Sequence, residues 1–325
     1  MRIRIAFAFC LLIAVVARAD FREFQNVPVD PSIESKLQHV ADAVLKQYPK
    51  LTADNLAISV VDLTKPATMG RGDYHGAVAF YPASVIKIFF MTETFRQRKE
   101  NDPDVPHALK EMIGISDNDA AAFIVDLITD TCSGPELEGR ALRRFIDKRG
   151  VVNRTFAAMG YGISAMMKPM SFGPYGRDMQ LLGTNAERRN RMTANDGAAL
   201  MMWIARRRAV SAAASEAMMA LLERPLNPLR KDENQVKEFI GEALPAGSKL
   251  WSKAGWTGEV RHDAAYVELP DGRKMVLVVC TRGAADDVTL IPGITRILLG
   301  EFGETPAPPP PPAPLPATAT TTTGK

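Results

Sequence analysis

Cysteine and histidine are scarce in this sequence. Its 325 residues include three cysteines and four histidines, and these form no C-x-x-C or H-E-x-x-H pattern. The scarcity excludes a disulfide-stapled mini-protein and gives no indication of a zinc or thiol redox centre, so we expect neither metal nor cofactor. Cys132 and Cys280 belong to the globular part of the chain, and their separation in sequence leaves open whether they form a disulfide.

The chain also lacks an excess of charge of one sign. It carries 40 lysines and arginines against 37 aspartates and glutamates. Arg2, Arg4 and Arg18 account for the difference, so the remainder is balanced. A balanced chain has no electrostatic footprint for nucleic acid or for an anionic membrane surface. The composition, 46% hydrophobic and 24% charged, is that of a soluble globular protein.

A single long apolar run is present, at the N-terminus. It spans residues 5–17, follows two arginines and ends at Ala17-Arg18-Ala19, a small-residue cleavage pattern. Such a run falls short of the roughly 20 apolar residues that span a bilayer, so a signal peptide over 1–19 is favoured over a membrane anchor. We therefore expect an exported protein, periplasmic or extracellular, with no membrane span once the signal peptide is removed.

Strand-like and helical patterns occupy separate parts of the chain. Apolar spacing predicts strands at 56–63, 77–80, 250–256, 263–269 and 275–281, with a hairpin turn at Asp271-Gly272 before the last. Helices are predicted at 32–48, 84–95, 117–128, 137–148, 194–206 and 290–302. This order predicts an α+β fold, in which an antiparallel sheet is built from both termini with flanking helices and an all-helical domain is inserted into it.

Three segments follow from this organisation. The signal peptide (1–19) precedes a globular domain over 20–304, with a sheet part at 20–81 and 246–304 and a helical part at 82–245. A proline- and threonine-rich tail occupies 305–325. Such a composition favours polyproline II and buries no apolar surface, so we expect the tail to be disordered.

The residues that can carry chemistry begin with Ser84-Val85-Ile86-Lys87. No G-x-S-x-G elbow is present and each histidine stands alone, which disfavours histidine-dependent serine chemistry. Pro82 suits the first turn of a helix, so Ser84 is expected near the helix N-terminus and Lys87 one turn further on the same face. A lysine that loses its proton on burial can accept the serine proton. The spacing also occurs by chance, in which case Lys87 is a surface residue.

Two further motifs lie downstream. Ser116-Asp117-Asn118 begins a predicted helix, and because these residue types are also ordinary N-caps, helix capping is the alternative. Lys253-Ala254-Gly255 lies in a predicted strand just before Trp256. Small residues there let a substrate backbone lie along an edge strand, and the lysine supplies a cation for a carboxylate.

Taken together in this order, the three motifs resemble those of the penicillin-recognising serine enzymes, and most of all class A serine β-lactamases. The resemblance extends over about residues 32–302 and implies the β-lactamase/transpeptidase-like fold. It implies that Ser84 is the acylated nucleophile, that Lys87 activates it, and that Ser116 passes a proton to the leaving nitrogen. The backbone N–H groups of Ser84 and Trp256 are then the oxyanion hole, where each donor contributes roughly 3 kcal/mol.

The same resemblance implies the substrate-binding residues. Asn118 is expected to hydrogen-bond the substrate amide and Lys87. Lys253 is expected to hold the substrate carboxylate, with Ala254 and Gly255 beside it on the strand. The implied partner is a small-molecule β-lactam or a cell-wall peptide, and the implied state is a monomer.

Two departures from the family pattern concern the helical part and the third motif. Ser84 and Ser116 are only 32 residues apart, about half the separation typical of the family, so the helical domain is expected to be shortened. Ala254 stands where the family has Thr or Ser, which removes a hydroxyl that would contact the substrate carboxylate.

The largest departure is a missing base. Class A enzymes hydrolyse their acyl-enzyme with a glutamate in an E-x-x-L-N loop. An ungapped alignment puts Gly176 at the glutamate position and Gln180 at the asparagine position. Asp178 is the nearest carboxylate, and we expect it to be a solvated loop residue rather than a substitute base.

These observations predict an exported serine hydrolase that acts by acyl transfer on a β-lactam or a related amide or ester, with deacylation in doubt. One alternative is a penicillin-binding D-Ala-D-Ala peptidase, because those enzymes also lack the loop glutamate. Another is a β-lactam-binding sensor domain that is acylated without turnover.

Overall fold

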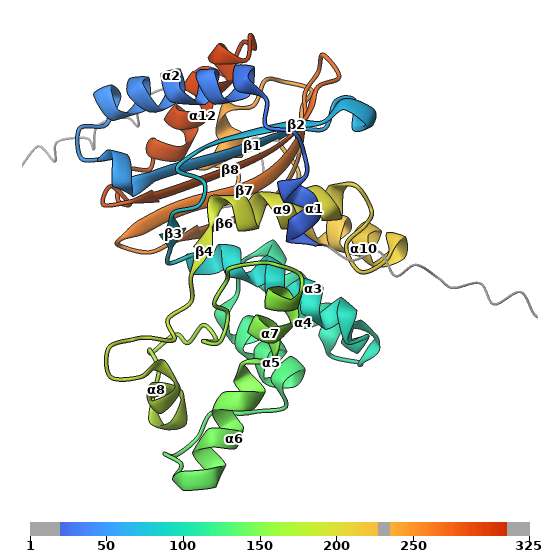
Figure 1. Cartoon of the computed structure of the whole chain (residues 1–325), viewed down its shortest axis with the longest axis vertical. Helices are drawn as coiled ribbons and strands as arrows, with labels where there is room; N and C mark the ends of the chain where they lie inside the picture. Colours follow the sequence, from blue (N-terminus) through green and yellow to red (C-terminus); the bar gives the residue numbers. More distant parts are fainter. Residues whose placement is uncertain (1–19, 227–234, 311–325) are drawn as a thin grey trace, which may run out of the picture.

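The computed structural model describes residues 20–226 and 235–310. The predicted signal peptide and residues 311–325 of the predicted tail lie outside the described residues. Six strands form one antiparallel sheet in the order β2-β1-β8-β7-β6-β5 (Figure 1). They are β1 (Leu56–Asp62), β2 (Gly70–Tyr74), β5 (Glu223–Arg224), β6 (Lys249–Trp256), β7 (Val260–Glu268) and β8 (Lys274–Arg282).

The sheet joins the two ends of the domain, as predicted. β1 pairs with β8, so that Leu56 faces Thr281 and Asp62 faces Met275. The four strands predicted at 56–63, 250–256, 263–269 and 275–281 all form, within a few residues at their ends. The α+β fold with a sheet from both termini is therefore confirmed.

Two strands of the sheet were not predicted. β2 has the sequence Gly-Arg-Gly-Asp-Tyr, which shows no apolar alternation. Its glycines are required by packing, because a Cβ at Gly72 would lie 2.7 Å from Cγ2 of Ile33 on the overlying helix. β5 has only two residues. The strand predicted at 77–80 is reduced to β3 (Ala79–Phe80), which pairs with β4 (Met192–Thr193) in a separate ribbon.

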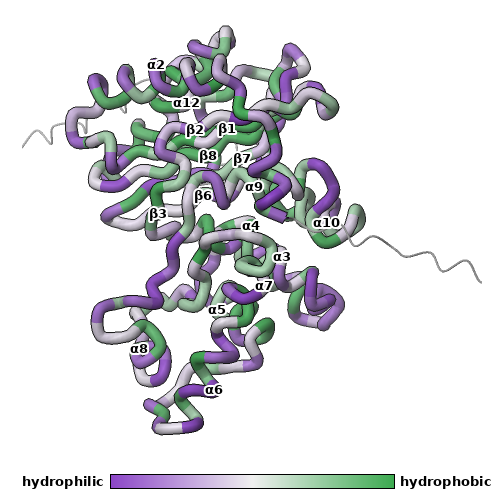
Figure 2. The backbone as a smooth tube through the Cα atoms, viewed as in Figure 1, coloured by the Kyte–Doolittle hydropathy of each residue, from purple (hydrophilic) through white to green (hydrophobic). Residues whose placement is uncertain are grey.

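Helices cover both faces of the sheet, which explains why its central strands are almost continuously buried. α2 (Pro31–Gln47) and α12 (Leu290–Glu301) lie on one face, and α9 (Ala194–Ala205) lies on the other, towards the helical domain (Figure 1). α9 is buried nearly throughout, and a capping box between Thr193 and Asp196 begins it. Figure 2 shows the hydrophobic stretches concentrated in the strands and in the helices that touch them.

The helical domain follows β3. It begins with a 3-10 turn, η3 (Ala83–Ile86), that leads into α3; the predicted helix at 84–95 is therefore α-helical only from Lys87. The remaining helices are α3 (Lys87–Arg96), α4 (Val105–Gly114), α5 (Asn118–Thr129), α6 (Gly139–Arg149), α7 (Val151–Ala158), α8 (Gly176–Leu182), α10 (Ala212–Leu222) and α11 (Ile240–Ala243). α1 (Phe21–Gln25) packs against this domain through Phe24 and the backbone of Phe21. No helix within 20–226 or 235–310 is long and apolar enough to cross a membrane.

The predicted tail begins later than expected. The Ala307 N–H donates to the Ala243 carbonyl at 3.0 Å, and Arg296 Nε donates to the Ala307 carbonyl at 2.9 Å. These bonds attach residues beyond Glu304 to α11 and α12, so the prediction of disorder from residue 305 is wrong for its first few residues.

Cys132 and Cys280, whose pairing the sequence does not decide, are both free: Cys132 is exposed and Cys280 is buried.

The packing of α12 on α2 gives a test of the fold. A Cβ at Gly293 would lie 1.8 Å from Oη of Tyr48, whose hydroxyl donates to the Thr289 carbonyl. We expect Gly293→Ala to lower the free energy of unfolding by about 1–3 kcal/mol, the usual cost of overpacking. Gly300→Ala on the same helix is the matched control, because nothing lies within 4 Å of its Cβ; it should be neutral or stabilising. Urea unfolding measures both, and equal effects would contradict this packing.

Candidate active site

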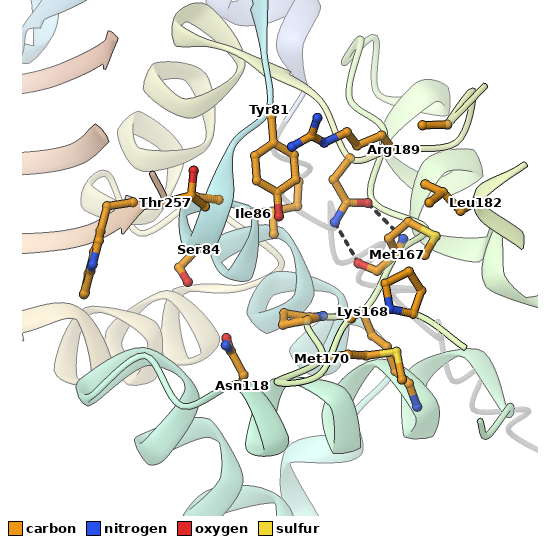
Figure 3. A pocket seen from close by; sticks show the side chains of 17 residues that line it. Tyr81, Ser84, Ile86, Asn118, Met167, Lys168, Met170, Leu182, Arg189 and Thr257 are labelled. Atoms are coloured by element: carbon orange, nitrogen blue, oxygen red, sulfur yellow. Dashed lines mark hydrogen bonds between the residues drawn. The ribbon is translucent and has the colours of Figure 1, made fainter. Parts of the chain in front are cut away.

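Ser84 lies in the first turn after β3, at the wall of an open cavity of about 400 Å³ (Figure 3). The turn is tight, since Ala83 before it has a left-handed φ of 46°. His262 on β7 supports this turn: its Nε2 lies 2.8 Å from the Tyr81 carbonyl, and its Nδ1 accepts from the Thr281 N–H at 3.0 Å. Burial lowers the pKa of His262 to about 4, so the ring is neutral and donates to Tyr81. This histidine is a buried core residue.

Lys87, one turn beyond Ser84, is completely buried. Its Nζ contacts four oxygens: the Ser116 carbonyl at 2.6 Å, the Ser116 Oγ at 3.3 Å, the Asp117 carbonyl at 3.1 Å and the Asn118 Oδ1 at 2.9 Å. Burial lowers the pKa of Lys87 to about 7, while the nearby Asp117 carboxylate raises it. The expected contact with Asn118 is present. A large fraction of this lysine is therefore neutral near pH 7 and can accept a proton.

Ser116 connects the three motifs. Its backbone is left-handed, with φ at 63°, which turns the chain sharply at the start of α5. Its Oγ lies 3.3 Å from Nζ of Lys87 and 3.0 Å from Nζ of Lys253. The neighbouring Asp117 caps α5 by accepting from the Ala120 N–H at 2.6 Å. The capping interpretation and the functional one therefore apply to different residues of the same motif.

Lys253 lies at the site, but more enclosed than expected. Its side chain has no exposed area, and its Nζ contacts the Ser116 Oγ at 3.0 Å, the Gln235 Oε1 at 2.5 Å and the Ala254 carbonyl at 2.7 Å. Burial lowers the pKa of Lys253 well below its ordinary value, and the charges of Lys87 and Arg224 act in the same direction. An ammonium has three donors, and these three oxygens occupy them. A substrate carboxylate could bind Lys253, as predicted, only by displacing one of them.

Gln235 is a site residue that the sequence did not reveal. Its Oε1 accepts from Lys253, and its Nε2 donates to the Gly114 carbonyl at 2.6 Å and the Ile113 carbonyl at 3.1 Å. It thereby attaches β6 to the end of α4. No motif contains it, because a glutamine in a connecting segment has no periodicity or spacing to distinguish it.

Gly255 brings β6 against the nucleophile turn. A Cβ there would lie 2.7 Å from the backbone N of Ser84 and 2.8 Å from that of Val85, so only glycine permits this approach. β5 pairs with β6 only at Leu250 and Trp251. Further along β6, the Ala254 N–H donates to Gln235 Oε1 at 3.3 Å and the Ala254 carbonyl accepts from Lys253, so side chains rather than a strand meet the edge beside Ser84. This is the edge that the third motif predicted.

Carboxylates are absent from the wall of the cavity. The residues that line it among the described ones include no aspartate and no glutamate: Tyr81, Ala83, Ser84, Ile86, Asn118, Met167, Lys168, Pro169, Met170, Gly173, Pro174, Leu182, Ala186, Arg189, Asn190, Trp256 and Thr257. No group of three or more metal-ligating side chains is gathered anywhere in 20–226 or 235–310.

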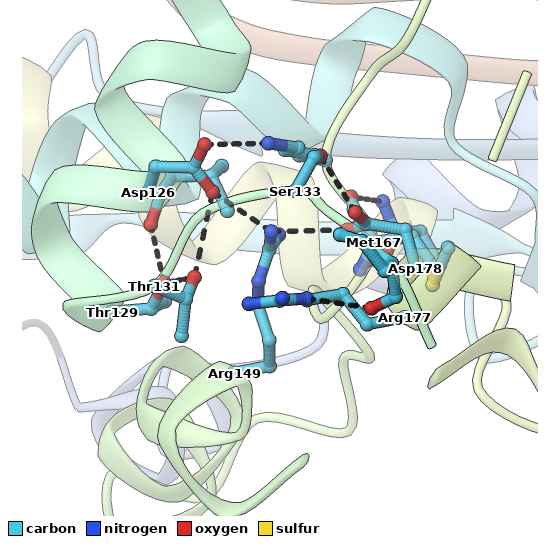
Figure 4. A network of polar contacts seen from close by, with 12 residues as sticks. Asp126, Thr129, Thr131, Ser133, Arg149, Met167, Arg177 and Asp178 are labelled. Atoms are coloured by element: carbon cyan, nitrogen blue, oxygen red, sulfur yellow. Dashed lines mark hydrogen bonds and ion pairs between the residues drawn. The ribbon is translucent and has the colours of Figure 1, made fainter. Parts of the chain in front are cut away.

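The prediction that Asp178 is solvated is wrong. Asp178 is fully buried in α8, where it accepts from Ser133 Oγ at 2.6 Å and from Arg149 Nη2 at 3.0 Å (Figure 4). Arg149 also reaches Asp126 at 2.8 Å, and Asp126 in turn pairs with Lys168 at 2.5 Å. A buried carboxylate requires such partners, and these attach the loop before β4 to α5 and α6.

There is no room for a glutamate at Gly176, the position that the ungapped alignment gives it. Gly176 has a φ of 49°, and a Cβ there would lie 2.1 Å from the Gly134 carbonyl oxygen. Neither Gly176 nor Gln180 lines the cavity. Gln180 instead exchanges two hydrogen bonds with the backbone of Leu137. The loop therefore takes its own path, with no position for a glutamate at 176.

Residues 98–302 match the family model described as the beta-lactamase enzyme family. The chain belongs to this family. Its fold is the β-lactamase/transpeptidase-like fold of the serine hydrolases. No curated protein matches the sequence.

Solved structures of the family share this fold. A β-lactamase from Sphaerobacter thermophilus is 21% identical over 81% of this chain and 97% of that chain, with a TM-score of 0.58. PBP-A is 20% identical over 85% of this chain and 98% of that chain, with a TM-score of 0.61. A class A β-lactamase from Mycobacterium abscessus is 15% identical over 82% of this chain and 99% of that chain, with a TM-score of 0.59.

The Asp178 network of this β-lactamase-like protein can be tested apart from its chemistry. We expect Asp178→Asn to lower the free energy of unfolding by roughly 3 kcal/mol, because it leaves the buried Arg149 with one carboxylate fewer. Covalent labelling of Ser84 in the folded protein should not change, since Asp178 does not line the cavity. Glu187→Gln, at an exposed position in the same loop, is the control. Loss of labelling without loss of stability would instead place Asp178 in the reaction.

Proposed function

We propose that this protein is an exported serine hydrolase, active as a monomer in the periplasm or outside the cell, that forms an acyl-enzyme on Ser84. Its substrate is a β-lactam or a related amide or ester. The observation that carries the proposal is the burial of Lys87 beside Ser116 and Asn118, which yields a proton acceptor with a pKa of about 7 one turn from an accessible serine.

Acylation then proceeds in two steps. Ser84 Oγ attacks the carbonyl carbon while its proton passes to the neutral amine of Lys87, and the oxygen that gains the negative charge lies between the N–H groups of Ser84 and Trp256. The Ser116 hydroxyl gives its proton to the leaving nitrogen and receives one from the lysine ammonium, and the C–N bond breaks. The close approach of Gly255 to the Ser84 backbone supports this placement of the oxyanion.

The roles proposed for Asn118 and Lys253 follow from their contacts. Asn118 lines the cavity and orients both Lys87 and the substrate amide. Lys253, with Gln235 behind it, keeps Ser116 Oγ in position and faces the leaving group. Ala254, Gly255 and Trp256 supply the strand edge along which the substrate lies.

Deacylation is proposed to be slow. It requires a water and a base near the ester carbonyl, and no carboxylate lines the cavity in the described chain. The same observation supports the alternative that the protein is a penicillin-binding D-Ala-D-Ala peptidase or a sensor that stays acylated. Steady turnover of a β-lactam distinguishes the hydrolase from both.

The acyl-enzyme can be observed directly. We expect benzylpenicillin to add its full mass to the protein, and a chromogenic cephalosporin to give a burst equal to the enzyme concentration followed by slow turnover. Ser84→Ala should abolish adduct and burst while unfolding at an unchanged denaturant concentration. An adduct of the same mass on Ser84→Ala would refute the nucleophile, and rapid turnover without a burst would refute slow deacylation.

The pH dependence tests the base. Because Lys87 acts as the neutral amine, the acylation rate should rise with pH through about 7 and level off above it. Asp117→Asn keeps an N-cap residue on α5 but removes the anion that raises the pKa of Lys87, so the midpoint should move to lower pH. Lys87→Arg, which cannot lose its proton, should acylate at least about 100-fold more slowly. A midpoint unmoved by Asp117→Asn, or near-native acylation by Lys87→Arg, would contradict this role.

A further inference from the structure

Lys168 lines the cavity, and Lys87 and Lys253 of the motifs are fully buried; each of the three already has partners. Lys87 contacts the oxygens of residues 116–118, and Lys253 contacts Ser116, Gln235 and its own neighbour's carbonyl. Lys168 is 8% exposed and pairs with Asp126 at 2.5 Å. None of the three presents a free ammonium to a bound molecule.

Arg189 is different, because it lines the cavity with half of its side chain exposed. The guanidinium carbon lies 4.2 Å from the ring centroid of Tyr81, two residues before the nucleophile turn (Figure 3). Stacking on a ring face fixes the plane of a guanidinium and leaves its N–H edges available for hydrogen bonds. A flat, oriented guanidinium of this kind is suited to bidentate contact with a carboxylate.

The backbone that carries Arg189 is also fixed. Asn190, the next residue, is buried, and its amide exchanges two hydrogen bonds with the backbone of Met167, at 2.7 and 2.9 Å. The two sides of the loop are thus connected directly beside the arginine. A cation held in this way loses less freedom when it binds a ligand than one on a mobile loop.

One carboxylate competes for Arg189 at present. Glu259, in the turn between β6 and β7, lies 3.5 Å from it, and the two side chains are 50% and 69% exposed. Exposed pairs of this kind contribute little to stability. A carboxylate of a bound molecule can therefore replace Glu259 at small cost.

The position of Arg189 decides which part of a substrate it meets. Ser116 and Lys253 mark the side of the leaving group, since the Ser116 Oγ joins the two lysines there. Arg189 lines the cavity together with Ser84 and stacks on Tyr81, whereas Ser116 and Lys253 do not line the cavity. Because neither residue of the leaving-group side lines this cavity, we place the acyl part of the substrate in it, within reach of Arg189.

We propose that Arg189, stacked on Tyr81, is a specificity-determining residue that selects substrates with a carboxylate on the acyl part. This inference rests on the proposed acylation of Ser84. Among residues 20–226 and 235–310 no acidic side chain lines the cavity, so none of them repels such a substrate from the wall. The substrate class is thereby narrowed to amides, esters or β-lactams with an anionic acyl group.

The test uses two penicillins that differ by one carboxylate on the acyl side chain, benzylpenicillin and α-carboxybenzylpenicillin. The second-order acylation rate of each is measured by intact mass, and their ratio is compared within each variant. The wild type should favour the carboxylated compound by about two- to five-fold, the range for an exposed ion pair. Arg189→Gln, which keeps a planar group over Tyr81 without the charge, should bring the ratio to about one.

Two further variants sharpen the result. Glu259→Gln should raise the ratio, because it removes the competing carboxylate, and it should have no such effect in the Arg189→Gln background. Arg191→Ala, an exposed arginine of the same loop that does not line the cavity, should leave the ratio at the wild-type value. A ratio near one in the wild type, or a ratio that Arg189→Gln does not change, would overturn the inference while the acylation of Ser84 stands. No adduct with either penicillin would overturn the proposed function and this inference with it.

Discussion

The site depends on the burial of two lysines without a carboxylate in direct contact. Removing an ammonium from water costs several kcal/mol unless its charge is lost or its donors are satisfied. Both occur here: the pKa of Lys87 falls to about 7, and its donors face four oxygens of residues 116–118. Lys253 is also buried among neutral partners, because its Nζ contacts Gln235 and Ser116. A carboxylate in their place would keep the lysines charged and unable to accept a proton.

The architecture supplies this environment from three directions. The sheet brings β6 against the nucleophile turn, and Gly255 allows backbone to meet backbone. The helical domain brings the start of α5, where the left-handed Ser116 directs carbonyls and a hydroxyl at Lys87. α9 fills the space between sheet and helices with an almost wholly buried apolar surface. None of these three elements would bury the lysines by itself. Together they exclude water from Lys87 and Lys253, while Ser84 stays accessible.

The loop before β4 makes a separate contribution. Asp178 and Lys168 of this loop pair with Arg149 of α6 and Asp126 of α5, and these pairs hold the loop in place. Asp178 is directed into this network and Glu187 does not line the cavity, so the loop supplies the cavity with amide, apolar and cationic groups but with no carboxylate. In the proposed reaction, the residues that serve acylation and the loop that would supply a base for hydrolysis are therefore different parts of the molecule, and the buried Asp178 of that loop has a structural role.

Much of this was determined by the sequence itself. The separation of strand and helix patterns predicted the sheet from both termini, since β pairing and helix packing follow from apolar periodicity. The resemblance of the three motifs to those of the penicillin-recognising serine enzymes predicted a common site for them, and Lys87, Ser116, Asn118 and Lys253 are in contact there. The hydroxyl, amine and amide groups that these residues offer follow from their residue types, which can be read directly from the sequence.

Other features were decided only by tertiary structure. Asp178 reads as a solvated loop residue, yet it is buried, because its partners Arg149 and Ser133 come from distant segments. A glutamate has no room at Gly176 because the carbonyl of Gly134 occupies the space of a side chain there. Gln235 and Arg189 belong to no motif, and their place at the site depends on which surfaces face each other after folding. Burial and long-range contacts decide which side chains are charged and which of them meet at the site. Both are properties of the folded chain and cannot be derived from a local stretch of sequence.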